Sequence, residues 1–199
     1  ESAGCRITTP KRSVSDPAAP VVRSKTSSSV TLVEIEGYEY RMGNGSWQTS
    51  PVFTGLSPAT TYVFYQRIAA TASSNASPAS AGLSVTTEKS TPQAAPQPVL
   101  KSVSDSTVTL QTVAGCEYRM KGGSWQSSPE FTGLSPATSY TFYQRYAATS
   151  QSYAGASSGG LTVVTSKKAT DAPEAPEAQE VYADCVVLKA VSGYEYRME

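Results

Sequence analysis

The sequence predicts an all-β protein built as a tandem array of antiparallel β-sandwiches. The hexapeptide GYEYRM begins at position 37, returns with one change at 115 and returns intact at 193, so the interval between copies is constant. Self-similarity at a constant period marks an array of like units, and a unit of about 78 residues can form a small domain. Each unit holds short runs with period-two alternation between turn-rich clusters, and no window carries apolar residues at helical spacing.

Strands are expected where β-branched or aromatic residues alternate with polar ones. SVTLVEI at 29–35 has this pattern, YEYRM at 38–42 alternates aromatic with charged residues, and TYVFYQRIA at 61–69 is a long aromatic-rich run. Clusters of Gly, Pro, Asn and Ser separate these runs. The strands expected in the first full unit are 21–25, 29–35, 37–42, 46–48, 51–54, 61–70 and 82–87, and the second unit should repeat them one period later.

Segments rich in proline and alanine connect the units, at 13–20, 88–98 and 167–178. Short segments of this composition behave as semi-rigid spacers. The ends of the chain match parts of the same repeat, so we expect the chain to be a window on a longer array. The expected organisation is the last strand and linker of a truncated repeat over 1–16, one sandwich over 17–90, a second over 91–168, and the first strands of a truncated repeat over 169–199.

The most specific local signal is LSPATTY at 56–62, which recurs as LSPATSY at 134–140. It resembles the corner between strands E and F of fibronectin type III domains, where a tyrosine near the start of strand F bonds its hydroxyl to upstream backbone. With FYQRIAAT after it, the unit resembles the fibronectin type III-like repeats of Gram-positive bacterial surface and secreted proteins. It departs from the animal domains, whose tryptophan lies on strand B, because the tryptophans here are Trp47 and Trp125. The corner residues that the resemblance implies are Leu56, Pro58 and Tyr62, repeated as Leu134, Pro136 and Tyr140.

The resemblance implies a seven-stranded, immunoglobulin-like sandwich in each unit. Strands A, B and E would form one sheet, and strands C, C′, F and G the other. Gln66 and Gln144 would point inward by alternation, so a β-bulge or a hydrogen bond across the sheets must satisfy them. The expected core of the first unit is Val30, Leu32, Tyr40, Trp47, Phe53, Leu56, Tyr62, Phe64, Leu83 and Val85.

Aromatic and charged residues supply the candidates for a binding surface. Tyr38 and Trp47 could form a platform on which a sugar stacks, or they could belong to the unit's small core. Glu39, Arg41 and Arg67 lie on adjacent strands, where opposite charges pair as a solvated ladder or offer a contact surface to a partner. The candidate partner or glycan contacts are Tyr38, Trp47, Arg67, Trp125 and Arg145.

The three cysteines occupy three different positions of the repeat. Cys5, Cys116 and Cys185 lie in separate repeats, and a disulfide requires Cα atoms within about 7 Å of each other. We therefore expect buried apolar thiols and no disulfide within one chain, and a disulfide between chains is the alternative.

Composition and charge exclude several functions. The net charge is zero, with 16 basic and 16 acidic residues, so we expect no nucleic-acid partner. No apolar run approaches the roughly 20 residues that span a bilayer, so we expect no membrane insertion in this segment. There is no histidine, and no nucleophile–base pair, carboxylate pair or metal cluster repeats. We expect neither enzymatic activity nor a cofactor.

The function expected from these observations is structural. The chain should be a stalk or fibre segment of an extracellular bacterial protein, secreted or attached to the cell surface. Its partners would be copies of itself in a fibre, or glycans or proteins of the cell wall or a host. The alternative is an adhesin, or a glycan-binding accessory module of a secreted carbohydrate-active enzyme.

Overall fold

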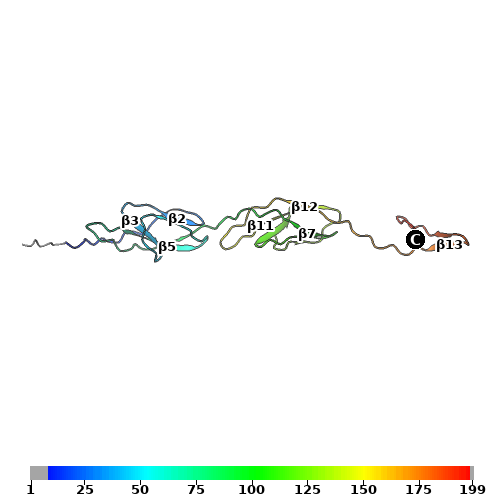
Figure 1. The fold of residues 1–199 in the computed structure, drawn as a ribbon, viewed down its shortest axis with the longest axis horizontal. Coiled ribbons are helices and arrows are strands. Elements are labelled where there is room, and N and C mark those ends of the chain that lie inside the picture. The colour runs from blue at the N-terminus through cyan, green and yellow to red at the C-terminus, as the bar shows by residue number, and fades with distance from the viewer. Residues whose placement is uncertain (1–8, 198–199) are drawn as a thin grey trace, which may run out of the picture.

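The computed structural model describes residues 9–197, and Figure 1 shows two β-rich units and a final pair of strands following one another along one long axis. All regular elements of this range are β-strands, and these form five small antiparallel sheets. Within the same range no helix is long and apolar enough to cross a membrane. The strand expected near the N-terminus falls largely on residues 1–8, outside the described residues.

Two three-stranded sheets make up the first unit. Their strand orders are β1-β2-β4 and β3-β5-β6, and all neighbouring strands are antiparallel. The strands expected as A, B and E are thereby separated from those expected as C, F and G. The strands are β1 (Val22–Lys25), β2 (Ser29–Leu32), β3 (Tyr38–Met42), β4 (Val52–Thr54), β5 (Thr61–Ile68) and β6 (Leu83–Thr86).

The seventh strand, expected at 46–48, is reduced to one bridging pair. Tyr40 and Gln48 exchange backbone hydrogen bonds of 2.7 and 2.9 Å. The side-chain amide of Gln48 then donates to the backbone oxygens of Ser50 and Val52, at 2.7 and 3.1 Å, and so turns the chain toward β4. The chain leaves the edge of β3 after one pair, and the described residues of this unit form six strands.

The second unit repeats this pairing one period further along the chain. Tyr118 lies opposite Gln144, as Tyr40 lies opposite Gln66 in the first unit. Its strand orders are β10-β8-β7 and β12-β11-β9. The strands are β7 (Leu100–Val103), β8 (Val108–Leu110), β9 (Cys116–Met120), β10 (Glu130–Phe131), β11 (Ser139–Tyr146) and β12 (Leu161–Val164).

The last described segment forms a two-stranded antiparallel sheet of β13 (Ala178–Val181) and β14 (Val186–Leu188). No second sheet covers it within the described residues. Its apolar side chains are consequently exposed, among them Val186 at 56% and Tyr194 at 46%.

A separate core lies between the two sheets of each unit. In the first unit Phe53 and Phe64 meet with ring centroids 4.9 Å apart and planes tilted by 55°. Tyr62 and Leu83 pack against this core but stay partly exposed. The buried residues are Val30, Leu32, Tyr40, Phe53, Leu56, Phe64 and Val85, and in the second unit Val108, Leu110, Tyr118, Phe131, Leu134, Phe142 and Val163.

The expected place of Trp47 in the core is wrong. Tyr40 points into the core and pairs with Gln48 across the bridge. Successive side chains along extended backbone face opposite sides, so the residue before Gln48 faces outward. Trp47 therefore lies half-buried on the outer face of the β3-β5-β6 sheet, against the side chains of Arg41 and Arg67.

The corner between β4 and β5 has a tyrosine hydroxyl bonded to backbone. The amide of Ser57 donates to the hydroxyl of Tyr62 at 2.9 Å, and Ser135 donates to Tyr140 at the same distance. The hydroxyl of Thr87 donates to the carbonyl of Ser57 at 2.7 Å and so ties this corner to the end of β6.

Tyr62→Phe should lower the free energy of unfolding of the first unit by about 1 kcal/mol, because the Ser57 amide loses its acceptor. Urea denaturation of the wild type and the variant measures this difference. Tyr65→Phe is the control, since no hydrogen bond links its hydroxyl to another described residue. Equal losses for the two variants would contradict the role of the corner.

Gln66 and Gln144 point inward and are almost fully buried. The register of β5 on β3 is continuous, so no bulge relieves them. Instead, the Nε2 atom of Gln66 donates to the carbonyl of Ala18 at 2.9 Å, and that of Gln144 donates to the carbonyl of Pro96 at 2.8 Å. The acceptor in each unit is the backbone of the segment that leads into its first strand.

The two cysteines within the described residues are free thiols. Cys116 is half-buried, whereas Cys185 on the uncovered last sheet is exposed, so the expectation of burial is wrong for Cys185. Cys5 lies outside the described residues, and its unpaired state stays a prediction.

Burial raises the pKa of the Cys116 thiol above its usual value. A raised pKa leaves less thiolate at a given pH, and the thiolate is the nucleophile. At pH 8, Cys185 should therefore react with iodoacetamide faster than Cys116, as followed by peptide mass spectrometry. In urea the two rates should converge, and a difference that persists there would point to a local sequence effect instead.

Candidate functional site

The outer face of the β3-β5-β6 sheet carries charged and aromatic side chains. Glu39 and Arg41 from β3 face outward because Tyr40 between them is buried. Tyr65 and Arg67 from β5 face the same way, and the register places Glu39 opposite Arg67 and Arg41 opposite Tyr65. We call these four residues together with Trp47 the arginine–tryptophan stack; its counterpart in the second unit is Glu117, Arg119, Trp125, Tyr143 and Arg145.

Two guanidinium groups lie over the indole of each stack. The Cζ atoms of Arg41 and Arg67 are 4.6 and 4.4 Å from the ring centroid of Trp47. In the second unit the corresponding distances are 4.6 and 4.2 Å. Arg41 also lies 5.2 Å from the ring centroid of Tyr65. Such contacts contribute about 0.5–1 kcal/mol each at exposed sites, so together they hold the outer face in one arrangement.

The two arginines of a stack differ in their charge partners. Arg67 donates from Nε to Glu39 at 2.7 Å, and Arg145 donates to Glu117 at 2.6 Å. Arg41 has no carboxylate partner among the described residues. Its Nε is shielded from solvent without a hydrogen-bond acceptor, and so is the Nε of Arg119. Each stack therefore contains one paired and one unpaired cation.

The expected sugar platform of Tyr38 and Trp47 is not formed. Tyr38 packs against the core of the first unit, on the inner face of β3, whereas Trp47 lies on the outer face. A sugar ring that stacks on this indole would compete with two guanidinium groups for the ring. Trp125, flanked by Arg119 and Arg145, is engaged in the same way.

The segments that precede the first and second units are each bound to that unit. Before the first unit, the Arg12 amide donates to the carbonyl of Ser73 at 3.0 Å, and the Asn75 amide donates to the carbonyl of Arg12 at 3.1 Å. The Nζ of Lys11 donates to the carbonyl of Thr71 at 2.9 Å. Arg12 and Ser74 thus form a parallel bridge, which joins the segment before the first unit to the loop between β5 and β6.

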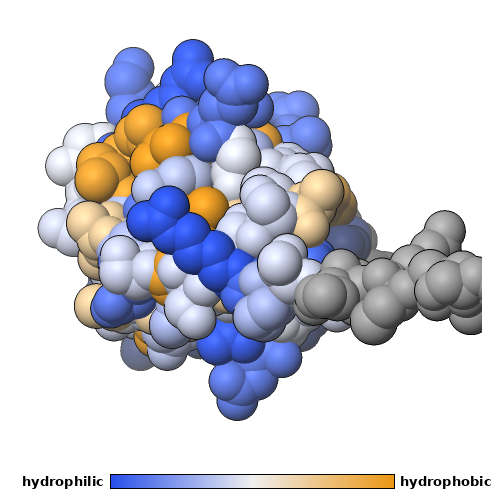
Figure 2. Space-filling view, turned by 90° about the vertical axis from the view of Figure 1, so that its left-hand side faces the viewer, coloured by the Kyte–Doolittle hydropathy of each residue, from blue (hydrophilic) through white to orange (hydrophobic). Residues whose placement is uncertain are grey.

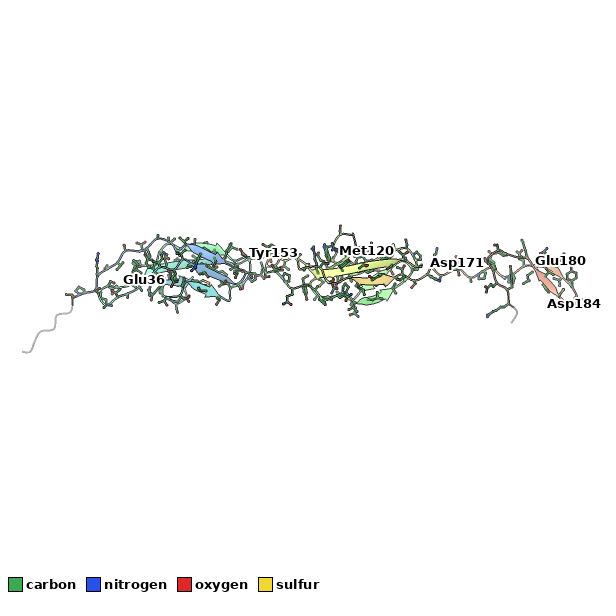
Figure 3. The ribbon with its side chains drawn as sticks, turned by 90° about the horizontal axis from the view of Figure 1, so that it is seen from above. Glu36, Met120, Tyr153, Asp171, Glu180 and Asp184 are labelled. Carbon is green, nitrogen blue, oxygen red and sulfur yellow. The ribbon has the colours of Figure 1, made fainter. Side chains whose placement is uncertain are left out.

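The same bonds recur between the two units. Ser90 donates its amide to the carbonyl of Gln151 and accepts from the amide of Tyr153, both at 2.9 Å. The Nζ of Lys89 donates to the carbonyl of Thr149 at 3.2 Å and lies 5.9 Å from the ring centroid of Tyr153. Figure 3 shows Tyr153 at the junction of the two units. Further along the connector, Gln97 donates to the carbonyl of Gly160 at 2.7 Å.

This docking was not predicted from the sequence, although one recurring residue indicated it. Lys11 and Lys89 occupy the same position of the repeat, and Lys167 occupies it again in the third connector. The acceptors are backbone carbonyls of a loop, and these leave no trace in the identity of side chains.

The end of the first unit that faces its connector is mainly polar. Figure 2 shows this end with an apolar area to one side and polar groups over most of the rest. Across the described residues, no group of three or more acidic or cysteine side chains is arranged to hold a metal ion.

No protein-family model matches the chain, and no curated protein matches it. Among solved structures, the crystal structure of chicken CNTN1 FN1–FN3 domains is similar, with 17% sequence identity and a TM-score of 0.32. The alignment covers 78% of this chain and 65% of that chain, so this chain spans less than two thirds of that structure.

Proposed function

We propose that this chain is a segment of an extracellular stalk or fibre that holds another part of its protein away from a cell surface. In this proposal it is a tandem array of fibronectin type III-like sandwiches, with strand C′ reduced to a bridge. The resemblance of the LSPATTY corner to bacterial surface repeats supports the extracellular, Gram-positive setting. The separation of strands A, B and E from C, F and G supports the sandwich topology.

The observation that carries the proposal is that the segments before the first and second units are docked on the unit that follows each of them. An undocked connector of this composition would act as a semi-rigid spacer, and it would leave the relative orientation of neighbouring units unfixed. Here Lys89 and Ser90 are bonded to the loop at 149–153, and Pro96 accepts a bond from the buried Gln144. The connector from Lys89 onward therefore behaves as part of the second unit. Glu88 directly before it is bonded to the first unit, because its amide donates to the carbonyl of Thr26 and its carbonyl accepts from the amide of Ala59, both at 3.0 Å. A rod made this way keeps its length under thermal motion, which is the property that a stalk needs.

Removing the docking bonds should make the chain more flexible. In the variant Lys89→Ala/Ser90→Pro, the connector loses the lysine bond and the amide donor to Gln151. Small-angle X-ray scattering should then show a broader distance distribution and a shorter mean end-to-end distance. Lys101→Ala on exposed β7 is the matched control and should leave the profile unchanged. A wild-type profile already as broad as that of the variant would overturn the proposal.

The alternative of an adhesin or glycan-binding accessory module gains no support from the stacks, because arginines already occupy the indoles. A glycan array with the full chain would decide between the two functions. Binding that is lost in Trp47→Ala and Trp125→Ala would favour the alternative.

A further inference from the structure

Each unit presents a cation on its outer sheet face without a charge partner. Arg41 and Arg119 make no ion pair with a described residue, and the Nε of each lacks an acceptor. The Nε is shielded from solvent, so an incoming anion would bind at the other nitrogens of the guanidinium, which are not among the shielded atoms without a partner. In the second unit Lys121, exposed and also without an ion pair to a described residue, follows two residues after Arg119, where the first unit has Gly43. The second unit thus offers two unpaired cations close together, Arg119 on the outer face and Lys121 in the turn that follows β9, and the first unit offers one.

The stack prepares its unpaired arginine for binding. The guanidinium of Arg119 lies over Trp125 at 4.6 Å and near Tyr143 at 5.5 Å, which restricts the side chain to a narrow range of orientations. A side chain that is already ordered loses less conformational entropy when it binds an anion. A guanidinium can also donate two parallel hydrogen bonds to one carboxylate, whereas an ammonium group acts as a point charge.

A matching anionic ridge lies in the third connector. Asp171, Glu174 and Glu177 follow one another at intervals of three residues, with Pro173 and Pro176 between them. Proline-rich segments favour the polyproline II helix, which has three residues per turn and rises about 3.1 Å per residue. In that conformation the carboxylates line one side, about 9 Å apart. All three side chains are exposed, and Figure 3 shows Asp171 between the second unit and the last strands.

Acidic residues at intervals of three occur in the third connector and not in the one before it. The equivalent positions of the preceding connector are Gln93, Pro96 and Val99, all uncharged. Within the described residues Asp171 and Glu174 make no ion pair. Glu177 lies 3.6 Å from Lys189 in an exposed pair, a type of contact that contributes little. The carboxylates are therefore available to a partner.

We propose that the acidic connector at 171–177 of one chain binds the outer sheet face of a second copy, preferentially at Arg119 and Lys121 of its second unit. Cα atoms two residues apart are at most about 7 Å from each other, and flexible side chains can match this spacing to carboxylates about 9 Å apart. A single contact of this kind is weak, so association is expected at low ionic strength and high protein concentration. The inference adds lateral contacts between chains to the proposed stalk. The contacts do not depend on the stalk proposal, and only their purpose in a fibre rests on it.

Sedimentation velocity of the full chain at low and high ionic strength tests the inference. At about 20 mM salt the chain should associate in a concentration-dependent way, and at about 0.5 M salt it should be monomeric, because exposed charges are then screened. The ridge variant Asp171→Asn/Glu174→Gln/Glu177→Gln and the face variant Arg119→Gln/Lys121→Gln should each stay monomeric at both salt concentrations. Arg41→Gln, the matched control in the first unit, should keep most of the association.

Mixing the two monomeric variants provides the decisive result. The ridge variant retains an intact sheet face, and the face variant retains an intact ridge, so an equimolar mixture should form a heterodimer at low salt. Exchanging Glu174 with Ala175 keeps the charge but breaks the interval of three, and should weaken association several-fold. A wild-type chain that is monomeric at low salt, a mixture that stays monomeric, or association indifferent to the ridge variant would each overturn the inference. Scattering from the monomer tests rod stiffness separately, so failure of either proposal can be recognised.

Discussion

Phe64→Ala should lower the free energy of unfolding of the first unit by about 3–5 kcal/mol and leave the second unit unchanged. Phe64 is fully buried, and its ring centroid lies 4.9 Å from that of Phe53 in a tilted arrangement. Truncation therefore removes buried ring area and leaves a cavity that its neighbours fill only in part. The cores of the two units share no residue, and their link is a connector bonded through exposed polar groups. The loss should therefore stay local.

Hydrogen exchange read by mass spectrometry measures both parts of this expectation. Peptides from 22–86 should lose protection in Phe64→Ala, while peptides from 100–164 keep it, and Phe142→Ala should give the reverse. Val52→Ala, at a side chain 43% exposed, is the control and should change protection little. Loss of protection in both units from one core substitution would show that they unfold together.

Tyr40→Phe should lower the free energy of unfolding by about 2 kcal/mol, although it removes a single oxygen. The ring is fully buried, and its hydroxyl accepts from the Ile35 amide at 2.7 Å and donates to the Val33 carbonyl at 3.2 Å. In the variant, the phenyl ring leaves the Ile35 amide and the Val33 carbonyl without a hydrogen-bond partner in the loop from β2 to β3. A buried donor without a partner costs about 1–3 kcal/mol.

Urea denaturation gives the size of this effect, and exchange of the Ile35 amide gives its location. Tyr38→Phe is the matched control on the same strand, because no hydrogen bond links its hydroxyl to another described residue. It should change stability by about 0.5 kcal/mol or less. An unchanged Ile35 exchange rate in Tyr40→Phe would mean that water replaces the hydroxyl, and the expected loss would then be absent.

The central strands of each unit were predictable because the side chains that define them also pack. Val30 and Leu32 alternate with polar residues in the sequence and are fully buried in the structure. The face of Trp47 was not predictable from the same rule. Its segment follows the turn at Gly43, whose φ is +54°, and a shift of one residue after a turn moves a side chain to the opposite face.

The candidate site was predictable only in part. The pairing of Glu39 with Arg67 follows from opposite charges on adjacent strands and is present at 2.7 Å. The position of Arg41 over Trp47 could not be derived, since it depends on which way the tryptophan faces. The connector contacts escaped prediction for a different reason: their acceptors, such as the carbonyl of Thr149, are backbone atoms common to every residue type.

The docked connector also defines the piece of chain that duplication can copy. A single unit transferred to a new place with its start inside the connector, between Ser90 and Pro96, would lack the residue that pairs with its loop at 149–153. A transfer that began directly after Thr87, the residue that closes the corner of the first unit, would carry the connector together with the sandwich it serves. The inherited module is then a sandwich with its own leading segment, running from about Glu88 to Thr165. Copies joined at that boundary arrive already able to attach to one another, so the array can lengthen without any change to an existing unit.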